Sequence, residues 1–195
     1  MTAFRIEPLS GDHDRAQFSS GSDALDRYFR EQASQDIRRR IATCFVAVSV
    51  ETKEVAGFYT LTATSIPLSA LAPDIVRKLP RYPVVPAALL GRLAVSRNYQ
   101  GKGLGGVLLG NAVLRTARAE LGVFAMLVDA KDEAAQRFHE HHGFTLLPDA
   151  ERRLCLPITV ARYPTLPAGV GKDRDRVRHE LSFQRAVLND PRKVF

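Results

Sequence analysis

The chain has 195 residues and a mass of 21.6 kDa, and 45% of its residues are apolar. This size and composition suit one domain with its own core, which excludes a disulfide- or metal-dependent miniprotein and a multi-domain protein. The 28 Lys and Arg exceed the 21 Asp and Glu, so the net charge is +7, and 22 of the cations are arginines. Such a charge indicates an anionic partner if it collects on one face; a generally basic surface is the alternative.

The first half of the chain alternates β-type runs with one amphipathic helix. The predicted elements are a strand at 4–9, a helix at 22–40, a hairpin of strands at 43–50 and 55–63, and a short helix at 73–79. The apolar residues of the long helix fall on one face, at Leu25, Tyr28, Phe29, Ala33 and Ile37. Ser22 is placed to cap its first turn, and the arginines at 38–40 suit the negative end of its dipole.

The second half predicts a strand–helix–strand–helix unit followed by two strands. In chain order these are a strand at 87–95, a helix at 104–121, a strand at 123–130, a helix at 132–142 ended by Gly143, and strands at 144–147 and 154–159. The order is mixed α/β. We expect one domain at 1–166. Residues 167–195 form a charged tail with seven Lys or Arg and four Asp or Glu, as a short helix or a disordered segment.

Targeting signals and cysteine placement indicate the compartment. Residues 1–8 are charged and lack an apolar run, so we expect no signal peptide. The uncharged stretch 56–73 contains several Thr, Ser and Pro residues and does not predict a membrane span. Cys44 and Cys155 lie far apart in apolar runs, which favours buried thiols over a disulfide or metal site. We therefore expect a cytoplasmic protein without membrane contact.

A glycine-rich turn at 96–106 joins a predicted strand to a predicted helix. Glycines let the backbone approach a ligand, and the first helical amides attract anions, so the turn predicts a phosphate or diphosphate site. A turn that binds nothing is the alternative. A Walker-type loop is excluded because Gly103, rather than Ser or Thr, follows Lys102. Gly101, Gly103 and Gly106 match a dinucleotide motif, but only one parallel-type unit follows, where that fold has several.

The spacing Gln100-x-x-Gly103-x-Gly105 resembles the coenzyme A diphosphate loop of the GNAT acetyltransferase superfamily. Further motifs follow in the family's order, namely strands at 92–95 and 126–130, Asp132-x-x-Ala135-x-x-Phe138, and Gly143-Phe144. The resemblance covers most of residues 18–158. It implies an α/β (α+β) fold, a single GNAT acyltransferase domain whose mixed, mostly antiparallel sheet has splayed central strands and flanking helices.

The same resemblance implies acetyl-CoA as cofactor. Its pantetheine arm would lie along the backbone of 93–95 and its diphosphate on the amides of 100–105, with Lys102 and Arg97 adding positive charge. Asp132 stands where the family often has Asn and still offers an acceptor. The residues that the resemblance assigns to acetyl-CoA are Leu93, Ala94, Val95, Gln100, Gly101, Lys102, Gly103, Leu104, Gly105, Gly106, Asp132, Ala135 and Phe138.

Three motifs, Phe18-x-x-Gly21-x-x-x-Leu25-Asp26-x-Tyr28, the run 57–61 and the run 89–95, resemble those of the tRNA-acetylating toxins of bacterial type II toxin–antitoxin modules. This resemblance implies acetylation of the α-amine of aminoacyl-tRNA, a homodimer and a ribbon-helix-helix antitoxin. Gripping tRNA fits the basic charge. The candidates for phosphate contacts are Arg38, Arg39, Arg40, Arg77, Lys78, Arg81 and Arg92. An ordinary solvated charge is the alternative for each, least so for Arg92, which lies in the motif strand.

The candidate catalytic residue is His139. The family motif Phe-Tyr-x-x-x-Gly-Phe supplies a Tyr that donates a proton to the departing thiolate, and here His139 occupies the position of that Tyr. Three interpretations stay open: His139 is the acid with a raised pKa, positioning dominates a weak catalysis, or the chain is inactive. An α-amine beside an ester is weakly basic, so no dedicated base is required. His141 and His142 do not face one point with His139, so we expect no metal.

These observations leave three hypotheses. The leading one is a toxin-type N-acetyltransferase that acetylates aminoacyl-tRNA, blocks translation and is neutralised by an antitoxin. The second is a GNAT acetyltransferase of a protein or small amine. The third is a catalytically weak or inactive GNAT module that serves as an antitoxin-binding partner.

Overall fold

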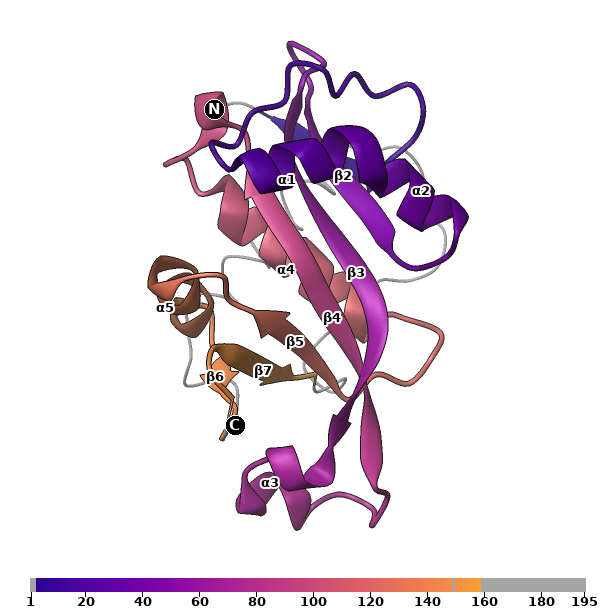
Figure 1. The fold of residues 1–195 in the computed structure, drawn as a ribbon, viewed down its shortest axis with the longest axis vertical. Coiled ribbons are helices and arrows are strands. Elements are labelled where there is room, and N and C mark those ends of the chain that lie inside the picture. The colour runs from indigo at the N-terminus through magenta and orange to yellow at the C-terminus, as the bar shows by residue number, and fades with distance from the viewer. Residues whose placement is uncertain (1–2, 149, 159–195) are drawn as a thin grey trace. The chain divides into compact units, whose positions relative to one another are not determined.

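The computed structural model describes residues 3–148 and 150–158, in which seven strands follow the hydrogen-bonded order β1-β2-β3-β4-β5-β7-β6 (Figure 1). The strands are β1 (Phe4–Pro8), β2 (Thr43–Ser49), β3 (Val55–Pro67), β4 (Val84–Val95), β5 (Ala125–Asp129), β6 (Thr145–Leu146) and β7 (Arg153–Pro157). The helices and turns are α1 (Asp23–Arg27), the π-helical turn η1 (Tyr28–Gln32), α2 (Ala33–Arg38), the 3₁₀ turn η2 (Leu68–Ala70), α3 (Pro73–Val76), the 3₁₀ turn η3 (Arg97–Tyr99), α4 (Leu104–Ala117) and α5 (Glu133–His141).

This arrangement confirms the predicted mixed α/β class and the mostly antiparallel sheet. β1 pairs antiparallel with β2, β2 with β3, and β7 with both β5 and β6. The splaying of the central strands and the domain boundary at 166 stay predictions, and the tail at 167–195 lies outside the described residues. The described residues form two units, a first from residues 3–63 and 89–112 and a second from Thr64–Ala88 and the described residues from Val113 on.

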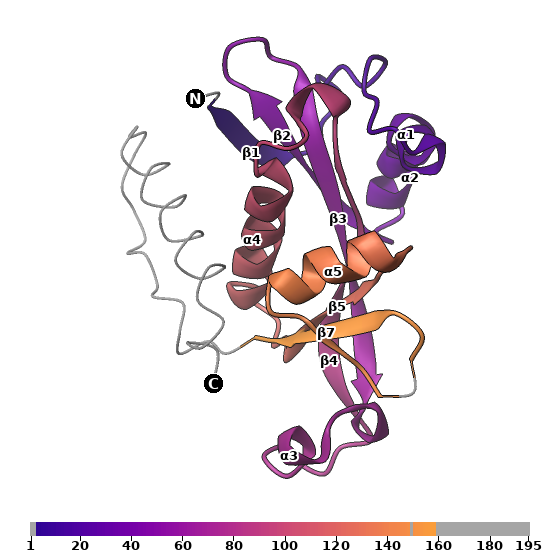
Figure 2. The ribbon, with the colours of Figure 1, turned by 90° about the vertical axis from the view of Figure 1, so that its left-hand side faces the viewer.

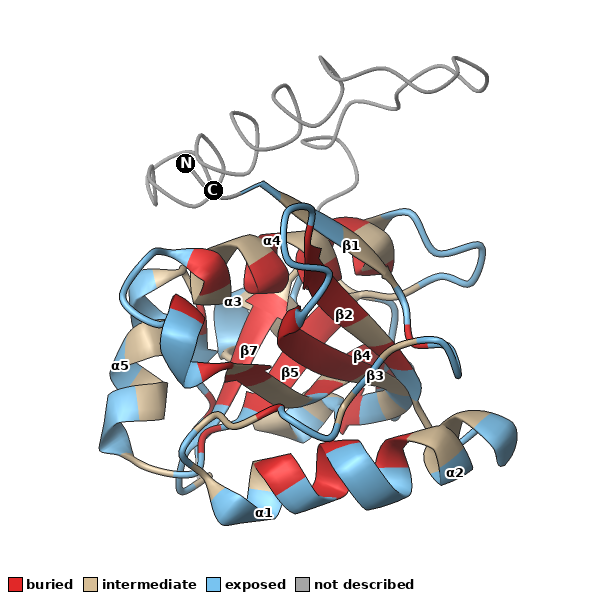
Figure 3. Cartoon of the chain, turned by 90° about the horizontal axis from the view of Figure 1, so that it is seen from above, coloured by how far each residue is buried: buried red, intermediate tan, exposed pale blue. Residues whose placement is uncertain are grey.

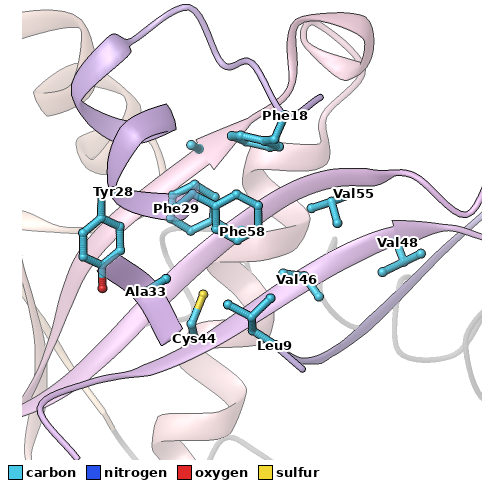
Figure 4. Packing of buried hydrophobic residues seen from close by; sticks show 11 residues of the cluster. Leu9, Phe18, Tyr28, Phe29, Ala33, Cys44, Val46, Val48, Val55 and Phe58 are labelled. Atoms are coloured by element: carbon cyan, nitrogen blue, oxygen red, sulfur yellow. The ribbon is translucent and has the colours of Figure 1, made fainter. Parts of the chain in front are cut away.

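The core of the first unit is aromatic and lies between the α1–α2 helical run and the strands (Figure 4). The rings of Phe29 and Phe58 stack with their centroids 4.3 Å apart and their planes within 8°. Phe18 meets both rings edge-on, at 4.9 and 5.5 Å. Offset and edge-to-face contacts of this kind add to the stabilisation from burial. Burial is concentrated on the strands and on one face of the helical run (Figure 3).

The opposite face of the first unit's strands is covered by the beginning of α4 (Figure 2). Successive side chains of a strand point to opposite faces, so Gly57 and Tyr59 face away from the aromatic core. A Cβ at Gly57 would lie 2.9 Å from the backbone oxygen of Ala94 and 2.8 Å from Cδ1 of Leu108, which leaves room only for glycine. The Tyr59 hydroxyl donates to Oδ1 of Asn111 at 2.7 Å. These contacts fix the start of α4 against the sheet.

The helix predicted at 22–40 differs from expectation in its middle and at its cap. The amide of Ala33 donates to the carbonyl of Tyr28, five residues earlier, and this π turn brings both side chains to the core face. The predicted apolar face is confirmed, with Leu25 and Ile37 packed against the same cluster. The prediction for Ser22 was half right: it occupies the N-cap position, but its side chain makes no capping bond within the described chain.

The second unit confirms the predicted helix α5 and shows where α4 ends. Asp132 Oδ1 accepts from the amide of Ala135 at 2.8 Å, and Gly143 has φ +88°, so both ends of α5 are capped. The predicted helix at 104–121 was too long, because α4 stops at Ala117 and Leu121 is 80% exposed. A periodic leucine beyond the helix end has no core to face.

The state of the two cysteines tests one prediction about local chemistry. Cys44 and Cys155 are free and buried as predicted, and burial raises the pKa of the Cys155 thiol to about 11. Among the described residues, no group of three His, Cys, Asp or Glu side chains is arranged to hold a metal ion. Within the same part of the chain, no helix is long and apolar enough to cross a bilayer.

Candidate coenzyme-binding site

The glycine-rich turn lies in the first unit, between the end of β4 and the start of α4. η3 follows the strand, and Gly101 and Gly103 then adopt φ values of +71° and +79°. These values lie in the left-handed region, where side chains other than glycine are strained. A Cβ built on either glycine meets no atom within 4 Å. The backbone therefore needs glycine for its conformation and leaves open space beside it.

The amides of residues 101–106 are available to a ligand. None of them donates to an acceptor in the part of the chain that the structure describes, and the first paired amide is that of Val107, which donates to the Gly103 carbonyl at 3.3 Å. They stand at the positive end of the α4 dipole. Unpaired N–H groups beside open space form a cradle for a phosphate or diphosphate. The predicted anion site therefore has the donors it needs.

Two predicted site side chains brace the turn. The Nε2 of Gln100 donates to the carbonyls of Ser20 and Val95, at 2.8 and 2.9 Å. Lys102 Nζ donates to the Asn98 carbonyl at 2.9 Å and remains exposed. The Gln100 side chain thus holds the turn together, and the ligand-facing groups are backbone amides.

Tyr99 anchors the turn to β1 and to the β2–β3 turn, a role that sequence reasoning missed. Its hydroxyl donates to Oε2 of Glu54 at 2.9 Å and lies 3.1 Å from the Thr52 hydroxyl. Its ring meets that of Phe4 edge-on at 5.6 Å. Since these partners come from the β2–β3 turn and from β1, only the fold brings them together.

Arg92, the favoured candidate for tRNA contact, lies in β4 over an aromatic ring. Its guanidinium carbon is 3.6 Å from the ring centroid of Tyr28, a cation–π geometry. The Tyr28 hydroxyl donates to Oδ2 of Asp36 at 2.9 Å, and burial raises the pKa of that hydroxyl. The arginine is half-buried, so its charge is held in one place instead of moving freely in solvent.

The other tRNA candidates divide between the two units. Arg38, Arg39 and Arg40 are exposed at the end of α2 in the first unit. Arg77, Lys78 and Arg81 are exposed after α3 in the second. Accessibility is what a phosphate contact requires, and it is equally what a solvated charge shows. The assignment of these six residues stays a prediction.

Three of the assigned cofactor residues belong to the second unit, where Asp132 is the N-cap of α5 and Ala135 and Phe138 lie within the helix. The carboxylate of Asp132 caps this helix, and the hydrogen bond from the Ala135 amide lowers the pKa of Asp132. One of its oxygens is therefore occupied, while Oδ2 lies 3.6 Å from Lys131 Nζ. Both carboxylate oxygens of Asp132 therefore have a partner on this chain.

His139 is buried in α5, only 8% exposed. Its ring meets those of Phe138 and Phe144 edge-on, at 5.1 and 5.4 Å. Its Nδ1 has no hydrogen-bond partner within the described residues. Burial first, and then the neighbouring His142, lower the pKa of His139 to about 4. The interpretation that needed a raised pKa is contradicted, because an imidazole in an apolar pocket without a carboxylate partner stays neutral.

Comparison with known proteins defines the class. Residues 10–144 match the family described as Acetyltransferase (GNAT) family. The chain belongs to the GNAT acetyltransferase family; it is an acyltransferase with acetyl-CoA as acyl donor. The amide cradle at 101–106 fits the diphosphate of that donor. The predicted family, fold class, enzyme class and cofactor are thereby confirmed.

Two relatives narrow the class. The chain is 38% identical over 156 residues to the tRNA-acetylating toxin of Mycobacterium tuberculosis, which covers 79% of this chain and 92% of that protein. It is 29% identical over 167 residues to the probable toxin TacT of Sinorhizobium fredii, with 80% and 92% covered. One relative is named a tRNA-acetylating toxin and the other a probable toxin, in agreement with the resemblance that the three sequence motifs carry.

Three solved structures have the same fold. A tyrosine-to-phenylalanine mutant of KacT superimposes with a TM-score of 0.74 at 26% identity, covering 80% of this chain and 95% of that one. AtaT complexed with acetyl-methionyl-tRNAfMet gives 0.73 at 29%, with the same coverage. AtaTR bound with acetyl-CoA gives 0.69 at 28%, covering 80% and 94%. Other matching structures hold AtaT bound to the C-terminus of the antitoxin AtaR.

Proposed function

We propose that this chain transfers the acetyl group of acetyl-CoA to the α-amine of an aminoacyl group esterified to tRNA, blocks translation in this way, and is neutralised by a ribbon-helix-helix antitoxin. The observation that carries the proposal is the 38% identity to a tRNA-acetylating toxin over four fifths of the chain. The AtaT complexes with acetyl-methionyl-tRNAfMet and with an antitoxin support the substrate and the partner.

The first unit supplies the groups that hold the donor. The amides of 101–106 would bind the diphosphate, and the backbone of Leu93, Ala94 and Val95, at the end of β4, would bind the pantetheine arm. When bound, acetyl-CoA supplies an activated acyl carbon as a thioester. A backbone amide near Val95 would then stabilise the negative charge that develops on the carbonyl oxygen.

The reaction forms a bond between the α-amine nitrogen and the acyl carbon and breaks the carbon–sulfur bond. The nitrogen loses one proton and the departing sulfur gains one. The amine is weakly basic, so positioning carries much of the rate. His139 is neutral near pH 7, and a neutral imidazole donates a hydrogen bond far more readily than a whole proton. Slow sulfur protonation is the expected weak point of this chain.

The arginine candidates would hold the acceptor. Arg92 is fixed over Tyr28, and Arg38–Arg40 are exposed in the same unit. Contacts to phosphates release counterions, so tRNA binding should weaken steeply with salt. We include a homodimer in the proposal because two copies present twice the basic surface to tRNA.

A second candidate function is favoured by the buried His139, whose Nδ1 has no hydrogen-bond partner in the described part of the chain. A chain without an effective acid would bind acetyl-CoA and antitoxin but turn over slowly. Such a protein would act chiefly as the antitoxin's binding partner. The two candidates differ in turnover and share the coenzyme site.

One experiment separates the candidates. The purified chain is incubated with radiolabelled acetyl-CoA and a set of aminoacyl-tRNAs, and the released aminoacyl groups are analysed. Uncharged tRNA, a polyamine and tRNA with a pre-blocked α-amine serve as controls. Label on the α-amine supports the first candidate. CoA binding without transfer supports the second, and label only on the polyamine or on protein contradicts both.

A further inference from the structure

A buried carboxylate holds a short turn in the first unit. Asp26, in α1, is only 4% exposed. Its Oδ1 accepts two hydrogen bonds from Ser20, at 2.8 Å from the amide and 2.6 Å from the hydroxyl. A carboxylate at the start of a helix is favoured by the helix dipole, and two donors offset part of the loss of hydration. The turn Ser19–Gly21 is therefore tied to the helix by one residue.

The same turn contacts the coenzyme loop through two hydrogen bonds and one close approach. The Ser20 carbonyl accepts from Nε2 of Gln100 at 2.8 Å, and the Ser19 carbonyl accepts from the Arg97 amide at 2.8 Å. Gly21 has φ +89°, and a Cβ there would lie 3.0 Å from Nε of Arg97. Arg97 and Gln100 directly precede the open amides of 101–106 in the chain. The Ser19–Gly21 turn therefore holds the residues that precede the open amides of the loop.

We propose that the Ser19–Gly21 turn, held by Asp26, is a positioning clamp that keeps the amides of 101–106 in their diphosphate-binding conformation before the coenzyme arrives. The inference rests on the proposed function, since it assigns the clamp to the coenzyme site named there. Asp26 acts through Ser20 and Gln100 and touches no substrate, so it is a positioning residue. The motif Gly21-x-x-x-Leu25-Asp26 thus contributes to coenzyme affinity as well as to the fold.

The geometry explains why each residue type is needed. A shorter acceptor than Asp at position 26 does not reach both donors of Ser20. A side chain at Gly21 is strained by the positive φ and displaces the Arg97 guanidinium. Gln100 offers one amide nitrogen to two carbonyls, so losing the Ser20 carbonyl leaves the Gln100 side chain bonded to the Val95 carbonyl alone. Preorganisation of this kind reduces the ordering cost of binding.

The test compares substitutions along the clamp. CoA affinity is measured by calorimetry, and hydrogen exchange of the amides 101–106 is measured without CoA. Asp26→Ala should weaken CoA about tenfold and speed exchange of these amides, because a buried acceptor is lost. Ser20→Ala removes only the hydroxyl and should weaken CoA about threefold. Asp26→Asn keeps an oxygen acceptor and should restore affinity and slow exchange.

Asp36→Ala is the matched control, because Asp36 lies in α2 of the same helical run and accepts only from the Tyr28 hydroxyl among the bonds to its side chain seen in the described chain. It should leave both readouts unchanged. Equal affinity and exchange in wild type and folded Asp26→Ala overturn the clamp, as does an equal loss in Asp36→Ala. If Asp26→Ala does not fold, an unchanged Ser20→Ala overturns it instead. Failure of the wild type to bind CoA contradicts the proposed coenzyme site itself.

Discussion

The candidate coenzyme turn of the first unit and the surroundings of His139 in the second unit differ in which polar groups lack a hydrogen-bond partner among the described residues. Around residues 95–106 the side chains are paired, through Gln100, Lys102 and Tyr99, and the groups left open are backbone amides. In α5 the group without a hydrogen-bond partner among the described residues is a buried ring nitrogen, the Nδ1 of His139. The first arrangement is prepared for an anion. The second keeps an imidazole neutral.

The difference indicates that binding of the acetyl donor and donation of a proton depend on separate features of this chain, so one can be kept while the other is weakened. The backbone cradle depends on glycine conformations and on a helix dipole, which surrounding side chains barely alter. Acid strength depends on burial and on neighbouring charges, so replacing a phenol by an imidazole in an apolar pocket changes it strongly. Binding is therefore expected to be intact where turnover is limited.

The largest expected effect is on the coenzyme turn. Gly103→Val should weaken CoA about a hundredfold, because a β-branched residue is strained at φ +79° and its methyls enter the open space beside the amides. Calorimetric titration with CoA measures the loss. Gly122→Ala is the control, since that glycine lies in open space without a positive φ and should bind CoA normally. A tight-binding Gly103→Val variant would show that the cradle lies elsewhere.

The next effect concerns the acid. His139→Tyr should raise kcat about tenfold to a hundredfold, because a phenol restores the family's proton donor. Steady-state transfer to aminoacyl-tRNA measures it, with the KM for acetyl-CoA unchanged. His141→Tyr, an exposed change on the same helix, should leave kcat as it is. An unchanged kcat in His139→Tyr would mean that position 139 is not where the proton is delivered.

A smaller effect is expected at Arg92. Arg92→Ala should weaken tRNA binding about tenfold and reduce the slope of log affinity against log salt by about one, as for one lost phosphate contact. Fluorescence anisotropy over a range of salt concentrations measures both. Arg137→Ala removes an equally charged but exposed residue paired with Glu133 at 2.9 Å, and should change neither. An unaltered salt slope in Arg92→Ala would assign Arg92 to packing on Tyr28 alone.

The smallest effect is on stability. The folded pKa of His139, about 4, lies below its unfolded value of about 6.5, so the unfolded chain takes up a proton first as the pH falls. The contribution of His139 to the free energy of unfolding is therefore present above about pH 6.5 and is lost as the pH falls towards 4. Between pH 7 and 5.5 the free energy of unfolding should fall by about 1 kcal/mol more in wild type than in His139→Phe. Urea unfolding at the two pH values measures this, and identical losses would show that His139 is solvated.

Local signals explain what the sequence predicted well. The turn at 96–106 and the helix end at Gly143 depend on residues within a few positions of each other, so their patterns can be recognised along the chain. The apolar face of the helix predicted at 22–40 could be recognised for the same reason. The π turn at Tyr28–Gln32 could not be recognised in the sequence, because it arises from fitting that face to the aromatic core.

The sequence by itself determined the order of strands and helices, the glycine-rich turn between β4 and α4, and a histidine, His139, where the resemblance places the family's tyrosine. Tertiary structure decided the state of each charged or polar side chain: the neutral His139, Arg92 over Tyr28, and Gln100 bridging two carbonyls. The reason is physical. Backbone conformation follows from neighbours in the chain, whereas burial and pairing depend on residues far apart in sequence. Ser20 and Gln100, eighty positions apart, meet only in the fold.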